Sequence, residues 1–101
     1  MRMYNPPHPG LLVKEFLDGA DVSLTKAAKH LGISRYLLLR IIKCQTAISA
    51  EMALRLEEAF GATKAETWLK MQLDYDLWQA EQKHEKSIVQ PFYHASVSAM
   101  V

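Results

Sequence analysis

Apolar residues recur at helical spacing near the start of the chain, after a short segment rich in proline. Each proline keeps the residue before it extended, so residues 4–9 are predicted to form a stiff arm. Pro9 suits the first position of a helix, where a backbone N–H is not needed. We therefore predict a helix from Pro9 to about Asp18, capped by His8 and ended by Gly19.

Four more helices are predicted from the same alternation of apolar and polar positions. Serines stand directly before three of them as N-caps, and glycines follow two of them. A capping box formed by Thr63 and Glu66 predicts the start of the last and longest helix. The predicted ranges are about 24–31, 35–43, 50–60 and 64–86.

The end of the chain differs from the rest, because Pro91 blocks a helix there. For residues 87–101 a flexible tail and a short strand are both open. The chain has 101 residues, which suffices for one domain and not for two. The predicted fold class is all-α, a compact five-helix bundle over residues 1–86 with a short irregular C-terminal tail at 87–101.

The spacing between the second and third predicted helices is the most informative in the chain. Ala28 is followed by Gly32, and Leu38 and Ile41 come next at helical spacing. A small residue allows close helix crossing, a glycine accepts a left-handed turn, and two apolar residues anchor the following helix. This pattern predicts a helix-turn-helix of the lambda-repressor-like kind.

Basic side chains gather in the same segment, although the chain as a whole is nearly neutral. The net charge is +1, yet residues 22–56 contain six of the 12 Lys and Arg residues and one of the 11 acidic residues. The segments on either side are net negative. A basic middle part indicates an anionic partner, and it coincides with the helix-turn-helix pattern.

With Leu38, Ile41 and Ile42 directed inward, the third predicted helix presents its other face for reading duplex DNA. Arginines suit guanine edges, whereas lysines and hydroxyls at a helix start suit phosphates. The predicted partner is therefore double-stranded operator DNA. The predicted DNA-binding residues are Ser23, Thr25, Lys26, Lys29, Ser34, Arg35, Tyr36, Leu37, Leu39, Arg40 and Lys43.

The last predicted helix carries two apolar stripes, whereas one is enough to cover a bundle. Aromatic residues are common at interfaces, so we predict that this helix forms a homodimer. The alternative is that the core of the monomer uses both stripes. The predicted interface residues are Trp68, Met71, Leu73, Tyr75, Leu77 and Trp78.

Several segments together resemble the HigA (VapI-type) antitoxins of the Xre/Cro-type helix-turn-helix family. They are NPPHPG at 5–10, LGISR at 31–35, AISAEMALRL at 47–56, and WL and YDLW at 68–69 and 75–78. The resemblance covers about residues 4–80. It implies a homodimer that binds its own operator, represses its operon and neutralises a small HigB-like ribonuclease toxin encoded beside it.

The sequence departs from that family pattern at several positions of the DNA-binding segment. Leu24 stands where a polar residue is usual, and Tyr36, Leu37 and Leu39 replace small polar residues. Three interpretations of Leu37 and Leu39 remain open. They contact thymine methyl groups, they form an apolar surface that reads DNA poorly, or they lie under a protein partner.

Residues needed for other functions are missing or scattered. The single cysteine, Cys44, excludes an internal disulfide framework and a thiolate zinc cluster. The histidines lack ligand spacing and no catalytic motif is found, so no metal, no cofactor and no enzyme activity are expected. Apolar runs are too short for a membrane span and no signal peptide is found, so a cytoplasmic protein is expected.

Two other functions remain open at this point. One is a free-standing Xre-type transcriptional repressor without a toxin, which the absence of a neighbouring toxin gene would favour. The other is an interaction module that has kept the fold and lost DNA binding. Leu24, Leu37 and Leu39 are the residues that favour this second alternative.

Overall fold

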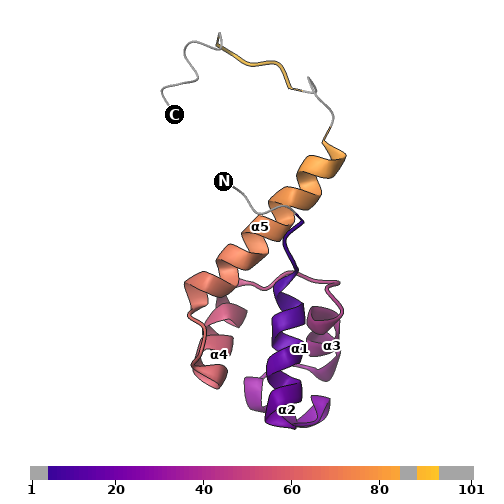
Figure 1. Ribbon diagram of the computed structural model, residues 1–101, viewed down its shortest axis with the longest axis vertical. Coiled ribbons are helices and arrows are strands. Elements are labelled where there is room, and N and C mark those ends of the chain that lie inside the picture. The colour runs from indigo at the N-terminus through magenta and orange to yellow at the C-terminus, as the bar shows by residue number, and fades with distance from the viewer. Residues whose placement is uncertain (1–4, 85–88, 94–101) are drawn as a thin grey trace.

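A computed structural model describes residues 5–84 and 89–93 of the chain. Within those residues it contains helices and no strand, which confirms the predicted all-α class (Figure 1). The helices are α1 Pro9–Ala20, α2 Leu24–Leu31, α3 Arg35–Ile42, α4 Ala50–Phe60 and α5 Ala65–Lys83. Helices α1 to α4 form a body, and α5 runs out from it past the start of α1 (Figure 1).

The core lies where α1, α3, α4 and α5 meet. Its fully buried large side chains are Val13, Leu38, Ile41, Leu56 and Trp68. Phe16 closes the core from the side, with its ring 5.9 Å from that of Trp68 and 4.9 Å from that of Phe60. Burying side chains of this size contributes about 1.5–3 kcal/mol each, so this cluster holds the bundle together.

Helix α1 begins as predicted but ends later. The imidazole Nδ1 of His8 accepts a hydrogen bond from the backbone N–H of Gly10 at 2.9 Å, which confirms the predicted cap. The prediction that Gly19 ends the helix is wrong. The left-handed residue is Asp21, with φ 55°, and its N–H donates to the carbonyl of Asp18. A short polar side chain tolerates that conformation, so a glycine was not required.

The three predicted serine caps are confirmed. The hydroxyl oxygens of Ser23, Ser34 and Ser49 each accept a hydrogen bond from the backbone N–H three residues later, at 3.0–3.1 Å. Helices α2 and α4 have the predicted bounds. Helix α3 ends at Ile42 rather than Lys43, which serves as its C-cap.

The start of α5 differs from the prediction. Thr63 and Glu66 do not form a capping box; the N-cap position is Lys64, whose side chain makes no capping bond. Instead, the Glu57 carboxylate of α4 accepts a hydrogen bond from the N–H of Ala65 at 3.2 Å. The acceptor comes from the preceding helix, and a local pattern does not contain that information.

The C-terminal end of the prediction falls mostly outside the described residues. Helix α5 ends at Lys83, and residues 85–88 and 94–101 are not described. The described residues 89–93 have neither helix nor strand. The division into a domain at 1–86 and a tail at 87–101 stays a prediction.

Candidate nucleic-acid interface

The turn between α2 and α3 has the geometry that the sequence pattern predicts. Gly32 is left-handed, with φ 73°, and its N–H donates to the carbonyl of Lys29. The N–H of Ile33 donates to the carbonyl of Ala28 at 3.0 Å, which ends α2 tightly. Because Ala28 is buried and Leu38 is anchored in the core, α3 crosses α2 directly after the turn.

The structure places the predicted DNA-binding side chains on the outside of α2 and α3. Nine of the eleven are exposed, and Leu39 and Arg40 are half-buried. Tyr36 protrudes furthest among the apolar and aromatic members, with 68% of its surface exposed. The interior side of α3 is occupied by Leu38 and Ile41, as predicted. Contact of the outer face with DNA stays a prediction here.

The two arginines of α3 differ in their surroundings. Arg40 donates to the hydroxyl of Tyr36 at 3.2 Å and to the carbonyl of Gln45 at 3.1 Å, and its guanidinium lies 5.8 Å from the Tyr36 ring centre. The guanidinium of Arg35 makes no hydrogen bond or ion pair within the described part of the chain. Within the described residues neither arginine forms an ion pair with a carboxylate, so no acidic neighbour there offsets either charge toward an anionic partner.

The departure at Leu24 has a structural explanation, and those at Tyr36 and Leu37 do not. Leu24 is half-buried and packs against the hydrophobic core. Leu37 and Tyr36 remain exposed on α3. The outer face of α3 therefore carries an apolar surface, and all three interpretations of Leu37 remain open.

The loop that follows α3 is held at both of its ends. Cys44 is left-handed, with φ 61°, and its N–H donates to the carbonyl of Ile41. Further along, the N–H of Ile48 donates to the side-chain oxygen of Gln72 at 2.9 Å, and the Gln72 amide donates to Asp76. Gln72 is buried, so α5 fixes this loop through a polar contact inside the protein.

His8 joins the N-terminal arm to α5 and to the same loop. Its ring meets the ring of Tyr75 edge-on at 4.8 Å, and it hydrogen-bonds to the backbone of Thr46. Burial lowers the pKa of His8, and the nearby Asp76 and the Thr46 contact partly oppose that shift. The neutral ring is the form that can accept at Nδ1, so the lowered pKa favours the helix cap.

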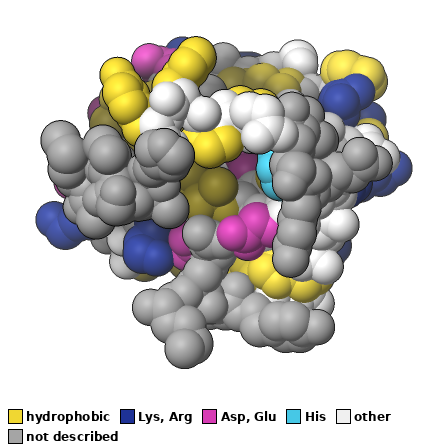
Figure 2. Space-filling view, turned by 90° about the horizontal axis from the view of Figure 1, so that it is seen from above, with side chains coloured by type: hydrophobic (Ala, Val, Ile, Leu, Met, Phe, Trp, Pro, Cys, Tyr) yellow, Lys and Arg dark blue, Asp and Glu magenta, His cyan; other side chains and the backbone are white. Residues whose placement is uncertain are grey.

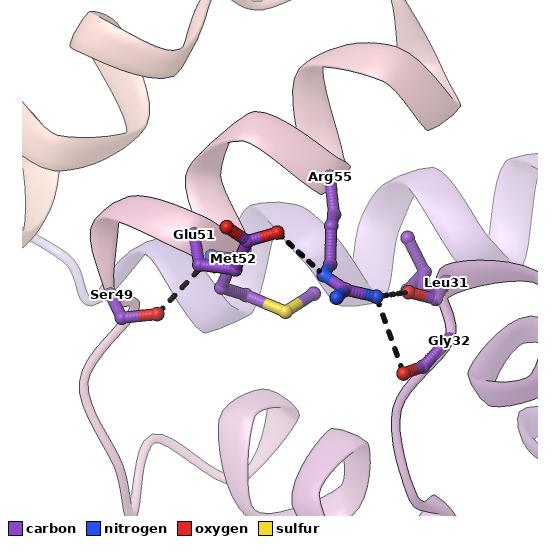
Figure 3. A network of polar contacts seen from close by, with 6 residues as sticks. All are labelled: Leu31, Gly32, Ser49, Glu51, Met52 and Arg55. Atoms are coloured by element: carbon purple, nitrogen blue, oxygen red, sulfur yellow. Dashed lines mark hydrogen bonds and ion pairs between the residues drawn. The ribbon is translucent and has the colours of Figure 1, made fainter.

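Sequence reasoning missed one polar contact of the turn. Arg55 of α4 donates through Nη1 to the carbonyls of Leu31 and Gly32, at 2.8 and 3.3 Å, and its Nε lies 3.2 Å from the Glu51 carboxylate (Figure 3). The spacing of Glu51 and Arg55 indicates an ion pair on one helix face. Nothing local indicates that the arginine reaches residues 23–24 positions earlier.

Comparison with known proteins places these features in a family. No protein-family model matches the chain. Virulence-associated protein A′ of Dichelobacter nodosus is 50% identical over 78 residues, which are 77% of this chain and 68% of that protein. An addiction module antidote protein of a HigA family from Coxiella burnetii has a TM-score of 0.75 and 38% identity, covering 91% of this chain and 100% of that chain. This chain belongs to the HigA family of helix-turn-helix antitoxins.

A second solved structure shows a similar protein with its nucleic acid. PA4674 of Pseudomonas aeruginosa, in complex with its operator DNA, has a TM-score of 0.75 and 35% identity, covering 89% of this chain and 100% of that chain. The HigA resemblance of the sequence is confirmed by the Coxiella burnetii structure, which covers 91% of this chain.

The predicted interface residues of this HigA-family chain do not share one surface. Trp68 is completely buried in the core of the monomer, so placing it in a dimer interface was wrong. Met71 packs against the core and Tyr75 against His8. Leu73 and Leu77 are the exposed members, at 55% and 38%, and Trp78 is half-buried. The stripe that contains Trp68, Met71 and Tyr75 therefore covers the bundle, and the stripe that contains Leu73 and Leu77 stays a predicted interface.

Figure 2 shows the molecule from the end at which α5 projects. Hydrophobic side chains gather on this face, and the lysines and arginines lie toward its rim. The described helices include none long and apolar enough to cross a membrane. In the same residues no group of three His, Cys, Asp or Glu side chains is placed to hold a metal ion. Burial raises the pKa of the Cys44 thiol, which disfavours the reactive thiolate.

Proposed function

We propose that this chain is a sequence-specific DNA-binding antitoxin that acts in the cytoplasm as a homodimer. It represses its own operon and neutralises a small HigB-like ribonuclease toxin. The observation that carries the proposal is the outward face of α3, where Arg35 and Arg40 have no acidic partner among the described residues. The operator complex of PA4674, a protein of similar fold, supports it.

In this mechanism α3 enters the major groove, and different side chains contact bases and phosphates. Arg35 reads a guanine edge. Arg40 donates a hydrogen bond to the Tyr36 hydroxyl and so holds the Tyr36 ring beside Arg35. Lys26, Lys29 and Lys43 contact phosphates, and so do Ser23 and Thr25 at the start of α2. Leu37 and Leu39 contact thymine methyls. Neutralised phosphates release counterions, so binding weakens as salt rises.

A homodimer gives such a short reading helix its specificity. Two copies of α3 about 34 Å apart meet successive major grooves on one side of a palindromic site. The exposed Leu73 and Leu77 on α5 form the contact between copies, because an exposed apolar stripe on a projecting helix is otherwise unfavourable.

The toxin contacts a different surface, and α1 with the proline arm or the C-terminal tail are the candidate regions. One experiment tests both partners. The chain is co-expressed with the adjacent gene, the complex is purified, and growth is compared with and without the chain. Rescue of growth and co-purification are expected. A free-standing repressor would bind DNA and have no toxic neighbour.

The exposure of Tyr36 and Leu37 favours one alternative, an interaction module without DNA binding. Fluorescence anisotropy with the promoter region of its own operon separates the two. The antitoxin gives a salt-sensitive signal, whereas the interaction module gives a salt-insensitive signal or none.

A further inference from the structure

The carbonyl end of α2 is bound by a side chain from another helix. Arg55 of α4 places Nη1 2.8 Å from the carbonyl oxygen of Leu31 and 3.3 Å from that of Gly32 (Figure 3). The last carbonyls of a helix lack intrahelical partners and form the negative end of its dipole. A guanidinium at this point donates hydrogen bonds to these carbonyls, and its positive charge stabilises the negative end of the dipole.

The guanidinium is itself held in place from the opposite side. Glu51, one turn earlier in α4, lies 3.2 Å from Nε of Arg55. The Glu51 carboxylate is largely exposed, so this ion pair alone contributes little stability. Its effect is to aim the planar guanidinium at the turn. Ser49 and the buried Met52 fix the first turn of α4 beneath it.

The turn leaves no space between its backbone and the arginine. A Cβ added at Gly32 would lie 2.5 Å from Nη1 of Arg55. Gly32 is required by its φ of 73°, and a side chain added there would push the guanidinium away from the turn. The arginine lies directly against the peptide that reverses the chain.

That peptide sets the start of α3. Ser34, two residues after Gly32, caps α3 by accepting a hydrogen bond from Leu37 at 3.0 Å, and Arg35 is the first residue of the helix. The far end of α3 is anchored separately, by Ile41 in the core. A movement of the Gly32 peptide would therefore displace the first turn of α3, which carries Arg35, while Leu38 and Ile41 stay fixed in the core.

We propose that Arg55 is a positioning residue for sequence-specific DNA reading, oriented by Glu51. It fixes the turn before α3 without touching DNA. This inference rests on the proposed function. It assigns to α4 a part in specificity that its distance in sequence from α3 does not suggest.

The test compares three variants, Arg55→Met, Arg55→Lys and Glu51→Gln, with the unaltered full chain. Lys14→Met is the matched control, because Lys14 also forms an exposed i,i+4 ion pair, with Asp18, and lies away from the turn. The probes are a duplex selected from a random library by the unaltered chain and a scrambled duplex of the same composition. Affinities are measured well below the melting temperature of every variant.

For Arg55→Met we expect affinity for the selected duplex to fall about tenfold, the size expected when hydrogen bonds from a charged group are lost. Affinity for the scrambled duplex should stay near that of Lys14→Met. Arg55→Lys should recover part of the loss, since an ammonium still binds one carbonyl. Glu51→Gln should show a smaller loss in the same direction. Amide exchange at Gly32 and Ile33 should quicken in Arg55→Met, while exchange in α5 stays unchanged.

Equal losses on both duplexes would make Arg55 a phosphate contact and overturn the proposal. If the ratio of the two affinities stays unchanged and only the melting temperature falls, Arg55 has a purely structural role. That result would also overturn the proposal. If the unaltered chain selects no sequence at all, the proposed function fails together with this inference. If it selects one and Arg55→Met keeps the same preference, the positioning role alone fails.

Discussion

Gly10 of α1 lies directly against the backbone carbonyl oxygen of Ile41 in α3. A Cβ added at Gly10 would overlap that oxygen and approach the ring of His8 at 3.1 Å. The absence of a side chain therefore allows α1 to reach the backbone near the end of the proposed reading helix. The two helices touch through main chain at this point.

Gly10→Ala should destabilise the protein by about 1–3 kcal/mol, because the added methyl group forces α1 away from α3. The measurement is denaturant unfolding followed by circular dichroism. Gly19→Ala is the control, since nothing lies within 4 Å of an added Cβ there. It should stabilise the chain by about 0.5–1 kcal/mol, as expected for a glycine replaced within a helix. Equal effects of the two substitutions would contradict the close approach.

Stability should fall as the pH drops below about 6.5, the ordinary pKa of histidine. Burial lowers the pKa of His8 in the folded chain, so the unfolded chain binds the proton first. The loss levels off once the pH is below the folded pKa as well. His8→Asn keeps an acceptor at the N-cap without titrating there, so it should remove this part of the pH dependence.

The measurement is the free energy of unfolding between pH 5 and 8, for the unaltered chain and for His8→Asn. His30→Asn is the control, because His30 is exposed on α2 and caps no helix. Parallel curves for the unaltered chain and His8→Asn would show that the cap does not depend on the neutral ring.

Arg35→Ala and Lys29→Ala should weaken DNA binding in different ways. Replacing the arginine should cost about 1–3 kcal/mol of binding free energy on the selected duplex and relax base preference, because Arg35 reads a base edge. Replacing the lysine should weaken binding to all duplexes alike and reduce the salt slope by about one, because Lys29 contacts a phosphate. Anisotropy titrations at several salt concentrations measure both, with Lys14→Ala as the control. If Arg35→Ala only changes the salt slope, the assignment of the reading face is wrong.

Replacing both Leu73 and Leu77 by glutamate should give a monomer that binds the operator weakly, because charges replace the exposed apolar stripe of α5. Light scattering at high micromolar concentration measures the oligomeric state. Leu11→Glu introduces a charge at a similarly exposed leucine on α1 and should leave the dimer intact. A monomeric unaltered chain at that concentration would remove the proposed dimer.

Local signals were sufficient for most helix starts and for the turn. Ser23, Ser34 and Ser49 cap within three residues of themselves, and Gly32 adopts its conformation for reasons contained in its own backbone. The exposed face of α3 followed from its two buried anchors. Features of this kind are readable because cause and effect lie within one helical turn.

Contacts between distant residues were not readable. Glu57 replaces the predicted capping box of α5, and Arg55 reaches back to Leu31, through helix packing that no local spacing encodes. Trp68 shows the same limit. Its stripe on α5 is visible in the sequence, but its burial depends on contacts with residues far away in the chain, such as Phe16 of α1.

The buried amide of Gln72 restricts what evolution can place at that position. Its oxygen accepts from Ile48 and its nitrogen donates to Asp76. A glutamate would set a second carboxylate against Asp76, and a leucine would leave the Ile48 N–H without its acceptor. An apolar substitution at Gln72 is therefore unfavourable unless the loop after α3 changes at the same time.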